Sequence, residues 1–534
     1  MKTKGNRWII PGSEYPVFPS YGSAKALSNT EELTYHIYIR SGKPLPDIAA
    51  FNTAHPSERK YLSQKEFRSQ YAASKRDTSL INRFAKDYQL KVDKIDPVYG
   101  RIIISGTAAN WNQAFDTQLL IYTNTTIAYK GSLSLPAYLT DVVLALYLFK
   151  STSPQAPAAK KMITGPFTAE PDEQGSTYLT PELGRLYNFP STGKGKGQKI
   201  AILEFDGGYL TSDIKTYFKL IKTPIPDIRP INEEGYKPST TTLSADAFFE
   251  TNLDIQVAGA LAPEAEFLIY QFPNGPNPYG DAIFAATFNP KEPVDIISIS
   301  YDTNERLVPQ MMIDLTDRAM QIASLLGITV CVASGDGGSP TRDASMVGSQ
   351  YASVNYPAIC SYALACGGTY TEHKKGQISL ETVWNDLNQA LMSSCGGRSV
   401  KVPVPEYQKD IDMPENANII GKVNGRGVPD VAGNASPLSP YEIIIKGEKK
   451  QIGGTSAVAP LWSALIAIMN ENLGFNLGFL HNELYKLQGT EALVSITQGN
   501  NGAYAALPGW DGCTGLGRPD GKALLKALKP SKKS

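Results

Sequence analysis

The chain has 534 residues, which is too long for one small domain and long enough for a small domain followed by a large one. Lys and Arg together number 51, as do Asp and Glu, so the formal net charge is zero. This balance argues against nucleic acid or an anionic membrane as the partner. The first residues, MKTKGNRWIIPGSEYP, lack the apolar segment of a secretory signal, and no apolar stretch reaches the length of a membrane span.

The five cysteines are few, odd in number and set in apolar or glycine-rich surroundings. We expect small core residues rather than a disulfide framework or a metal site. They are Cys331, Cys360, Cys366, Cys395 and Cys513.

The N-terminal part alternates strands and helices in a way that predicts a ferredoxin-like module. Strands are expected at 33–40, 90–96, 100–106 and 117–122, and helices at 63–74, 79–88 and 108–115. We therefore predict a domain over 1–150 with a ferredoxin-like core over about 31–125. The stretch 151–177 is rich in Pro, Ala, Gly and Ser without a sustained period, and it is expected to be an exposed linker.

From residue 178 to 534 the pattern predicts a large α/β domain. Apolar strands such as QKIAILEF, AEFLIYQF, VDIISISY and ITVCVASG alternate with helical segments. Alternation of this kind predicts a largely parallel sheet covered by helices on both faces. Later, EIIIKGEKKQIGG predicts a hairpin that turns at Lys446 and Gly447.

A pair of acidic residues stands four apart in FFETNLDIQVAGALAP, and helical spacing places Glu250 and Asp254 on one face. One interpretation is a solvated acidic face. The other is that the apolar neighbours draw at least one carboxylate out of water, so that sharing a proton raises one pKa.

Another acidic residue, Asp336, follows the apolar run GITVCVAS inside a glycine loop. Loops at the ends of buried parallel strands collect functional residues, although Asp336 could equally shape the turn.

The segment GGTSAVAPLW places Ser456 at the start of a buried helix. A hydroxyl there suits a nucleophile, because the helix dipole and backbone N–H groups can stabilise an oxyanion; an ordinary tight turn is the alternative. The sequence has only four histidines, and each is expected at the surface or as a cap, namely His36, His55, His373 and His481. The base for Ser456 is then expected to be a carboxylate.

Taken together, these segments resemble the sedolisin family of serine-carboxyl peptidases. The matching words, in the order of the family, are LTPELGRLYNFP, ETNLDIQVAGALAPEA, ISISY, ASGDGG, YALACGGT, ETVWND, RGVPDVAGNA, IGGTSAVAPLW and GWDGCTGLGRPDG. The N-terminal words YLSQKEFRSQYAAS, FAKDYQLKV and ISGTAANWNQAFDTQL resemble the activation prodomain of the family. The resemblance implies a subtilisin-like fold after a prodomain that acts as an intramolecular chaperone and inhibitor.

The resemblance also implies roles for individual residues. Ser456 would be the nucleophile, Glu250 its general base and Asp254 the acid that orients Glu250, while Asp336 would line the oxyanion hole. Glu204 matches an outer glutamate of the proton network. Tyr301 stands where the family has tryptophan, a departure that leaves the triad whole.

Calcium is the one cofactor that the resemblance implies. The family holds one structural ion near its C-terminus, and the matching positions here are Ser495, Ile496, Leu507, Gly509 and Asp511. Ser495 replaces an aspartate and Leu507 a glycine, so binding is expected to be weaker.

The resemblance places Asn355 near the substrate cleft, at a position where a family member has an acidic residue, and asparagine there would weaken attraction for a basic side chain. The alternative is that Asn355 only caps a turn.

The function predicted from these residues is an acid-active serine endopeptidase made as a self-processing zymogen that cleaves itself in the linker. Its substrates are expected to be polypeptides, and the chain is expected to be a monomer working outside the cell or in an acidic compartment. Two alternatives stay open: a sedolisin-fold binding or structural protein that has lost activity, and a subtilisin-type hydrolase with a histidine base.

Overall fold

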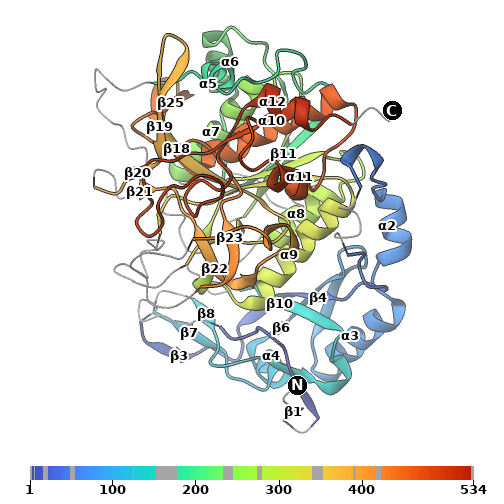
Figure 1. The fold of residues 1–534 in the computed structure, drawn as a ribbon. Helices are drawn as coiled ribbons and strands as arrows, with labels where there is room; N and C mark the ends of the chain where they lie inside the picture. The colour runs from blue at the N-terminus through green and yellow to red at the C-terminus, as the bar shows by residue number, and fades with distance from the viewer. Residues whose placement is uncertain are drawn as a thin grey trace.

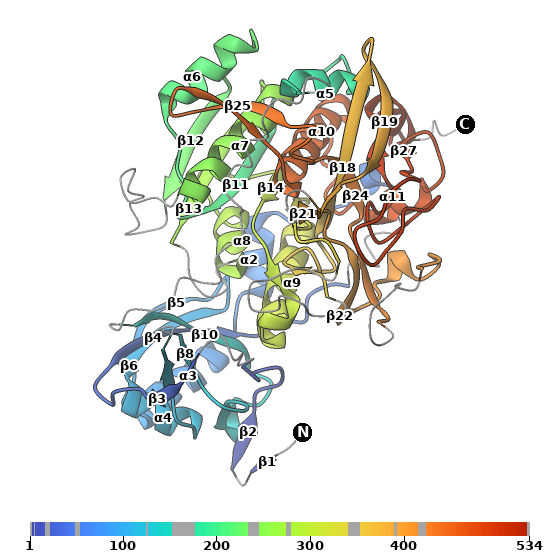
Figure 2. The same ribbon diagram turned by 90° about the vertical axis from the view of Figure 1, so that its left-hand side faces the viewer.

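The computed structural model describes residues 3–4, 6–15, 22–47, 54–123, 126–151, 177–232, 245–273, 279–339, 353–388, 392–414 and 423–530. These residues form an N-terminal part and a larger α/β part that lies against it (Figures 1 and 2). The linker expected at 151–177 falls almost wholly on residues 152–176, outside the described ranges.

The N-terminal part is built on a four-stranded antiparallel sheet with the order β10-β4-β6-β5. Its strands are β4 (Glu32–Ile39), β5 (Lys91–Asp96), β6 (Arg101–Thr107) and β10 (Val143–Ser151). The helices are α2 (Gln64–Tyr71), α3 (Lys75–Asp87) and α4 (Ala108–Phe115). Ser63, Ser74 and Thr107 cap them by accepting backbone N–H groups of the first turn.

The ferredoxin-like order of strands and helices is present, but the predicted boundary at about residue 125 was wrong. The fourth strand of the sheet is β10, whereas the strand expected at 117–122 is the short β7 (Leu120–Tyr122). β7 pairs instead with β3 (Ala24–Ala26) and β8 (Ile127–Ala128). A further small sheet joins β1 (Thr3–Lys4), β2 (Arg7–Ile9) and β9 (Ser134–Pro136).

The larger part is organised by an eight-stranded sheet with the order β12-β13-β11-β14-β16-β18-β19, in which β24 also pairs with β18. All of the pairings are parallel except that of β18 with β19, so the predicted parallel sheet is confirmed. The strands are β11 (Lys199–Phe205), β12 (Asp227–Asn232), β13 (Glu266–Phe272), β14 (Ile296–Ile299), β16 (Thr329–Ala333), β18 (Leu364–Lys374), β19 (Gln377–Val383) and β24 (Val431–Asn434).

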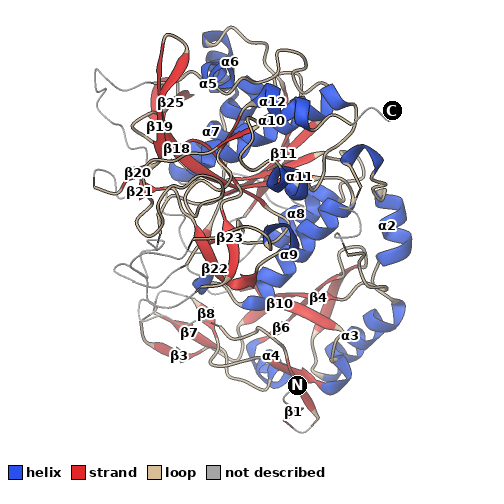
Figure 3. Cartoon of the chain, in the orientation of Figure 1, coloured by secondary structure: helices blue, strands red, loops and turns tan. Residues whose placement is uncertain are grey.

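Helices cover both faces of this sheet (Figure 3). One face packs on α7 (Ala245–Leu261) and α10 (Val458–Leu473), with α5 (Thr180–Leu186) and α6 (Thr211–Leu220) beside α7. The other face packs on α8 (Tyr279–Thr287) and α9 (Gln310–Leu325). The side chains of β11 alternate accordingly: Ile200 and Ile202 face α7 and α10, while Ala201 and Leu203 face the other layer.

Short elements complete the larger part. The hairpin of β25 (Tyr441–Ile445) and β26 (Glu448–Ile452) turns at Lys446 and Gly447, both with positive φ, as predicted. The other short pairs are β15 (Thr303–Asn304) with β17 (Asn355–Tyr356), β20 (Asn385–Asp386) with β21 (Met392–Ser393), β22 (Gly397–Pro403) with β23 (Gly425–Val428), and β27 (Leu493–Val494) with β28 (Arg518–Pro519). Two helices near the C-terminus are α11 (His481–Lys486) and α12 (Gly521–Ala527).

The two parts share one hydrophobic core. Buried side chains of the N-terminal sheet and of α8 and α9 form a single cluster, and β10 lies against α9 (Figure 2). Within this apolar interface one carboxylate, that of Asp281 on α8, is buried. His36 Nδ1 lies 2.8 Å and Arg101 Nη1 3.1 Å from its oxygens, and the hydroxyls of Tyr38 and Tyr147 also donate to it.

A second contact lies at the segment before α2. Arg59 forms an ion pair with Glu483 of α11 at 2.6 Å, and the Tyr61 hydroxyl donates to the carbonyl of Leu477. The amide of Leu62 donates to the carbonyl of Leu325 at the end of α9. The N-terminal part therefore contacts the larger one through both its sheet and this segment.

Within the described ranges, every helix is too short or too polar to cross a lipid bilayer. All five cysteines are buried and unpaired, as predicted.

Candidate active site

Ser456 lies where the sequence predicts it, in a turn that leads into a buried helix. The chain leaves β26, passes Gly454 at a φ of 141°, forms a 3-10 turn over Thr455–Ala457 and enters α10. Ser456 is buried, and its hydroxyl donates to the carbonyl of Ser300 over 3.4 Å. Ser300 Oγ in turn donates to the carbonyl of Ser456 over 3.1 Å. These contacts join the turn to the carboxyl end of β14.

The predicted acidic pair lies on α7, which contacts the turn that carries Ser456. Glu250 is 4% exposed and Asp254 is fully buried, so the alternative of a solvated acidic face was wrong. α7 is enclosed by the sheet, α10 and the β25–β26 hairpin, which explains why its polar residues leave water. Each carboxylate is thereby placed in a medium where its protonation state depends on its neighbours.

Glu204 and Tyr301 extend this acidic group. The Tyr301 hydroxyl donates to Glu204 Oε2 over 2.8 Å, and Thr251 Oγ1 donates to the same oxygen over 2.9 Å. Burial, and then the negative charges of Glu204, Glu250 and Asp254, raise the pKa of Tyr301 well above its ordinary value. The phenol therefore stays protonated and serves as a donor. Tyr301 therefore lies within electrostatic reach of all three carboxylates.

Asp336 lies in the loop after β16 and is hydrogen-bonded to the turn that carries Ser456. Its Oδ1 accepts two hydrogen bonds from Thr455, one from the backbone N–H over 2.8 Å and one from the hydroxyl over 2.7 Å. The N–H of Gly335 donates to the Thr455 hydroxyl oxygen over 3.0 Å. The alternative, that Asp336 only shapes its own turn, does not account for these contacts with Thr455.

Asn355 lies on β17 beside this loop. Its side-chain amide donates to Asp302 Oδ2 over 3.2 Å, and both groups lie against the α-carbon of Gly335. Its carbonyl accepts the N–H of Ile359 in the following turn. Asn355 is therefore close to Asp336, while its part in substrate preference stays a prediction.

The histidines occupy other places, and two of them contradict the expected surface positions. His36 is buried beside Asp281, and His481 is buried on α11. His481 Nε2 lies 2.8 Å from the carbonyl of Ala363 and 3.5 Å from Asp430, and the rings of Tyr407 and Phe479 pack against the imidazole. His55 caps a 3-10 turn as expected, and His373 lies 3.6 Å from Glu182.

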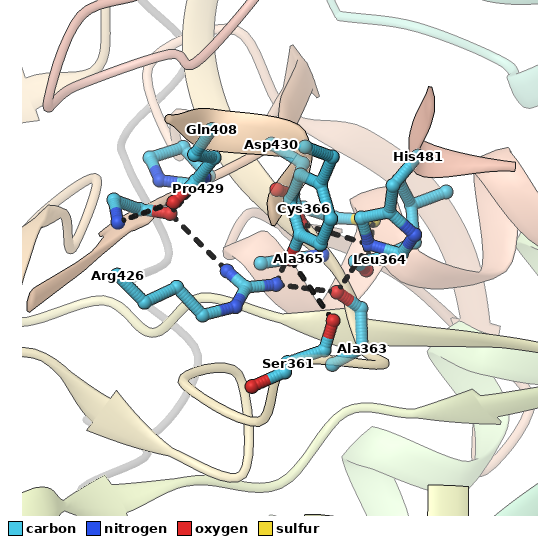
Figure 4. A network of polar contacts seen from close by, with 12 residues as sticks. Ser361, Ala363, Leu364, Ala365, Cys366, Gln408, Arg426, Pro429, Asp430 and His481 are labelled. Atoms are coloured by element: carbon cyan, nitrogen blue, oxygen red, sulfur yellow. Dashed lines mark hydrogen bonds and ion pairs between the residues drawn. The ribbon is translucent and has the colours of Figure 1, made fainter. Parts of the chain in front are cut away.

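Figure 4 shows the buried network that contains His481. Arg426 pairs with Asp430 at 2.9 Å, and Tyr485 and the N–H of Ala365 also donate to Asp430. Burial raises the pKa of Asp430, but the charge of Arg426 and the hydrogen bonds outweigh it and leave the pKa below its ordinary value. The network joins β18, the segment before β24 and α11.

The residues expected to hold calcium lie together but do not fit a calcium cage. Asp511 is the one carboxylate among them, and its Oδ1 accepts the N–H groups of Cys513 and Thr514, both over 2.8 Å. Its Oδ2 accepts the N–H of Leu507 over 3.1 Å, and Ser495 Oγ accepts the N–H of Gly509 over 3.2 Å. Burial raises the pKa of Asp511 to about 6.

Calcium prefers several charged or carbonyl oxygens turned toward the ion. Here the serine hydroxyl meets an N–H group instead, and the carboxylate lies among the amides of its own turn. Ile496, the remaining member of the set, is buried in the same small cluster as Cys513.

The sequence reasoning missed Thr455, Thr251 and Ser300. Each stands next to a residue that it did identify, and each acts through a hydroxyl or a carbonyl. Adjacency in sequence was the only available signal.

Known proteins resemble this chain in both sequence and fold. Residues 21–147 match the family model "Pro-kumamolisin, activation domain". The chain is 37% identical over 488 residues to kumamolisin of Bacillus sp. (strain MN-32), covering 89% of this chain and 87% of the relative. It is 27% identical over 428 residues to tripeptidyl-peptidase SED1 of Arthroderma otae, covering 65% of this chain and 63% of the relative.

Among solved structures, Pseudomonas sedolisin, a serine-carboxyl proteinase, superposes with a TM-score of 0.59 at 24% identity, covering 66% of this chain and 98% of that one. This likeness agrees with the parallel sheet and its helical layers. The extent of the match to kumamolisin shows that the chain belongs to the sedolisin family of serine-carboxyl peptidases and carries an activation prodomain.

Proposed function

We propose that this peptidase is an acid-active endopeptidase that hydrolyses peptide bonds through Ser456, Glu250 and Asp254, with Asp336 in the oxyanion hole. The observation that carries the proposal is that α7, which bears the two buried carboxylates, packs against the turn of Ser456. A serine there needs a base, and the four histidines lie at other sites.

In this mechanism Glu250, as the carboxylate, accepts the proton of Ser456 while the serine oxygen attacks the peptide carbonyl. Asp254, one turn along α7, orients Glu250. Asp336, as the neutral acid, donates a hydrogen bond to the oxyanion that forms on the carbonyl oxygen. Glu250 then returns its proton to the leaving amine, and water releases the acyl group by the same steps.

These roles require Glu250 to be ionised and Asp336 to be protonated at the same time, a condition met in acid. The test is the pH–rate profile of the purified chain on a denatured protein, with Ser456→Ala as the control. An optimum at or above neutral pH, or activity that persists in the alanine variant, contradicts the proposal.

Endopeptidase activity is proposed over tripeptidyl-peptidase activity. Kumamolisin resembles this chain over most of its length, whereas the relatives named as tripeptidyl-peptidases match it at lower identity. A protein substrate with a blocked N-terminus separates the two. Internal cleavage supports the endopeptidase, and resistance of the blocked substrate supports release of tripeptides.

We also propose that the prodomain inhibits the enzyme until acid conditions allow self-cleavage within 151–177, in a monomer that works outside the cell or in an acidic compartment. The shared core and the buried groups around Asp281 support the inhibitory role. Mass spectrometry after acid incubation should show a new N-terminus between residues 160 and 178. An active chain of unchanged mass contradicts self-processing. A Ser456 that does not react with a peptide aldehyde would favour the alternative of a binding protein.

A further inference from the structure

We infer that Thr455 determines which oxygen of Asp336 carries the acidic proton, and so aims that proton at the oxyanion. The inference rests on the proposed function, because it concerns the donor that the oxyanion needs. It adds a positioning residue that lies directly before the nucleophile.

The hydrogen bonds of Thr455 fix the direction in which its hydroxyl donates. The N–H of Gly335 donates to Thr455 Oγ1, so the lone pair that faces Gly335 is occupied. The hydroxyl hydrogen is then directed to Asp336 Oδ1, 2.7 Å away, beside the N–H of Thr455 itself at 2.8 Å. Thr455 is fully buried, so water does not compete for these bonds.

Oδ1 of Asp336 thus faces two hydrogen-bond donors. A carboxyl oxygen that carries a proton is a poor acceptor, and its own hydrogen would oppose the two hydrogens that already point at it. When Asp336 is protonated, the proton therefore resides on Oδ2. This oxygen lies on the side of Gly454, where a Cβ built on that glycine would approach Oδ2 to 2.9 Å. Gly454 directly precedes the turn Thr455–Ala457, so Oδ2 lies beside the turn that carries Ser456.

Other groups that face this region carry negative or neutral charge. Asp302 lies on the far side of Gly335. Burial raises the pKa of the Cys395 thiol well above its ordinary value, and the charges of Asp302 and Asp336 contribute. A raised pKa keeps Cys395 a neutral thiol, and a thiol is only a weak hydrogen-bond donor beside the hydroxyl of Thr455.

The experiment compares Thr455→Val, Thr455→Ala and Thr455→Ser in the full chain after acid activation. Valine keeps the shape of threonine and removes the hydroxyl. Alanine also removes the hydroxyl but places no methyl group against Gly335. Serine keeps the hydroxyl. We expect kcat to fall by roughly 10- to 100-fold in the valine and alanine variants. The serine variant should recover most of it.

The pH profile separates positioning from general damage. A hydroxyl that donates to a carboxylate favours its ionised form, so its removal should shift the alkaline limb of kcat/KM upward by about one pH unit. Serine should restore the limb. A loss of kcat in valine and alanine with an unmoved limb, or a serine variant as impaired as alanine, overturns the inference.

A double-mutant cycle with Asp336→Ala tests whether Thr455 acts through Asp336. With binding of a peptide aldehyde as the readout, Thr455→Ala should weaken binding in the parent chain and change it less than twofold in the Asp336→Ala background. Equal losses in both backgrounds overturn the inference. If Ser456→Ala abolishes activity and Thr455→Ala leaves it unchanged, only this inference is overturned. If activity survives in Ser456→Ala, the proposed function is overturned as well.

Discussion

The carboxylate of Asp281 allows a quantitative prediction about the attachment of the prodomain. It is buried in the interface and neutralises Arg101, which is 9% exposed, while His36, Tyr38 and Tyr147 surround it. Asp281→Asn keeps the shape and removes the charge, so Arg101 is left buried without its counter-ion. Breaking a buried pair in this way costs about 3 kcal/mol or more. We therefore expect prodomain detachment to become roughly 100-fold more favourable.

Two amides report this detachment directly. The N–H of Leu62 donates to Leu325 of α9, and the N–H of Met311 on α9 donates to Gly12 of the prodomain. Hydrogen exchange of peptides that contain these amides should accelerate by about the same factor, since exchange requires the two parts to separate. The background is Ser456→Ala, which is expected to keep the chain intact.

Asp227→Asn is the matched control, because that aspartate lies on β12 with its side chain 57% exposed. Exposed pairs contribute little, so exchange should stay within about twofold of the parent. If Asp281→Asn exchanges no faster than Asp227→Asn at either amide, the interface does not depend on its buried charge and the reasoning fails.

Three further predictions rest on other contacts. Tyr301→Phe should lower kcat by roughly tenfold, because it removes the donor to Glu204. Tyr301→Trp should lower kcat by a smaller factor, because an indole N–H can also donate to Glu204. Steady-state kinetics on one peptide measures both variants, and equal kcat values contradict a donor role. A chelator should leave the melting temperature of the parent chain unchanged, whereas the melting temperature of Ser495→Asp should rise with added calcium. A lower melting temperature of the parent chain in the chelator refutes the first of these expectations. Burial raises the pKa of Asp511 above its value in the unfolded chain, so the folded state binds the proton more tightly and the free energy of unfolding should increase as the pH falls from about 6 toward 4. Denaturant melts at several pH values should show this increase in the parent and not in Asp511→Asn. The same pH dependence in both proteins contradicts the prediction.

The sequence predicts the sheet and its helices because these depend on local patterns, whereas the roles of the site residues come from the family resemblance and stay predictions. Apolar runs, glycine loops and the spacing of Glu250 and Asp254 are all visible within a few residues. The fourth strand of the prodomain was missed because strand pairing is decided by contacts between distant segments: 117–122 and 143–151 are both plausible strands, and only β10 reaches β4.

The same limit applies to the site. Thr455 and Asp336 are 119 residues apart, so no local pattern reveals that one holds the other. The burial of His36 and of His481 likewise follows from Asp281 and Asp430, whose positions the fold decides. Calcium was expected from a resemblance between loops, yet the direction of an N–H group toward Ser495 is a three-dimensional property.

The core shared by the prodomain and α8 and α9 has a consequence for the life of the enzyme after activation. If the prodomain is removed as proposed, a mature chain that unfolds no longer has the prodomain surface against which those helices pack. Refolding of such a chain is expected to be slow, so its persistence would depend on a high barrier to unfolding. The half-life of the mature chain, rather than its equilibrium stability, would then limit how long it works.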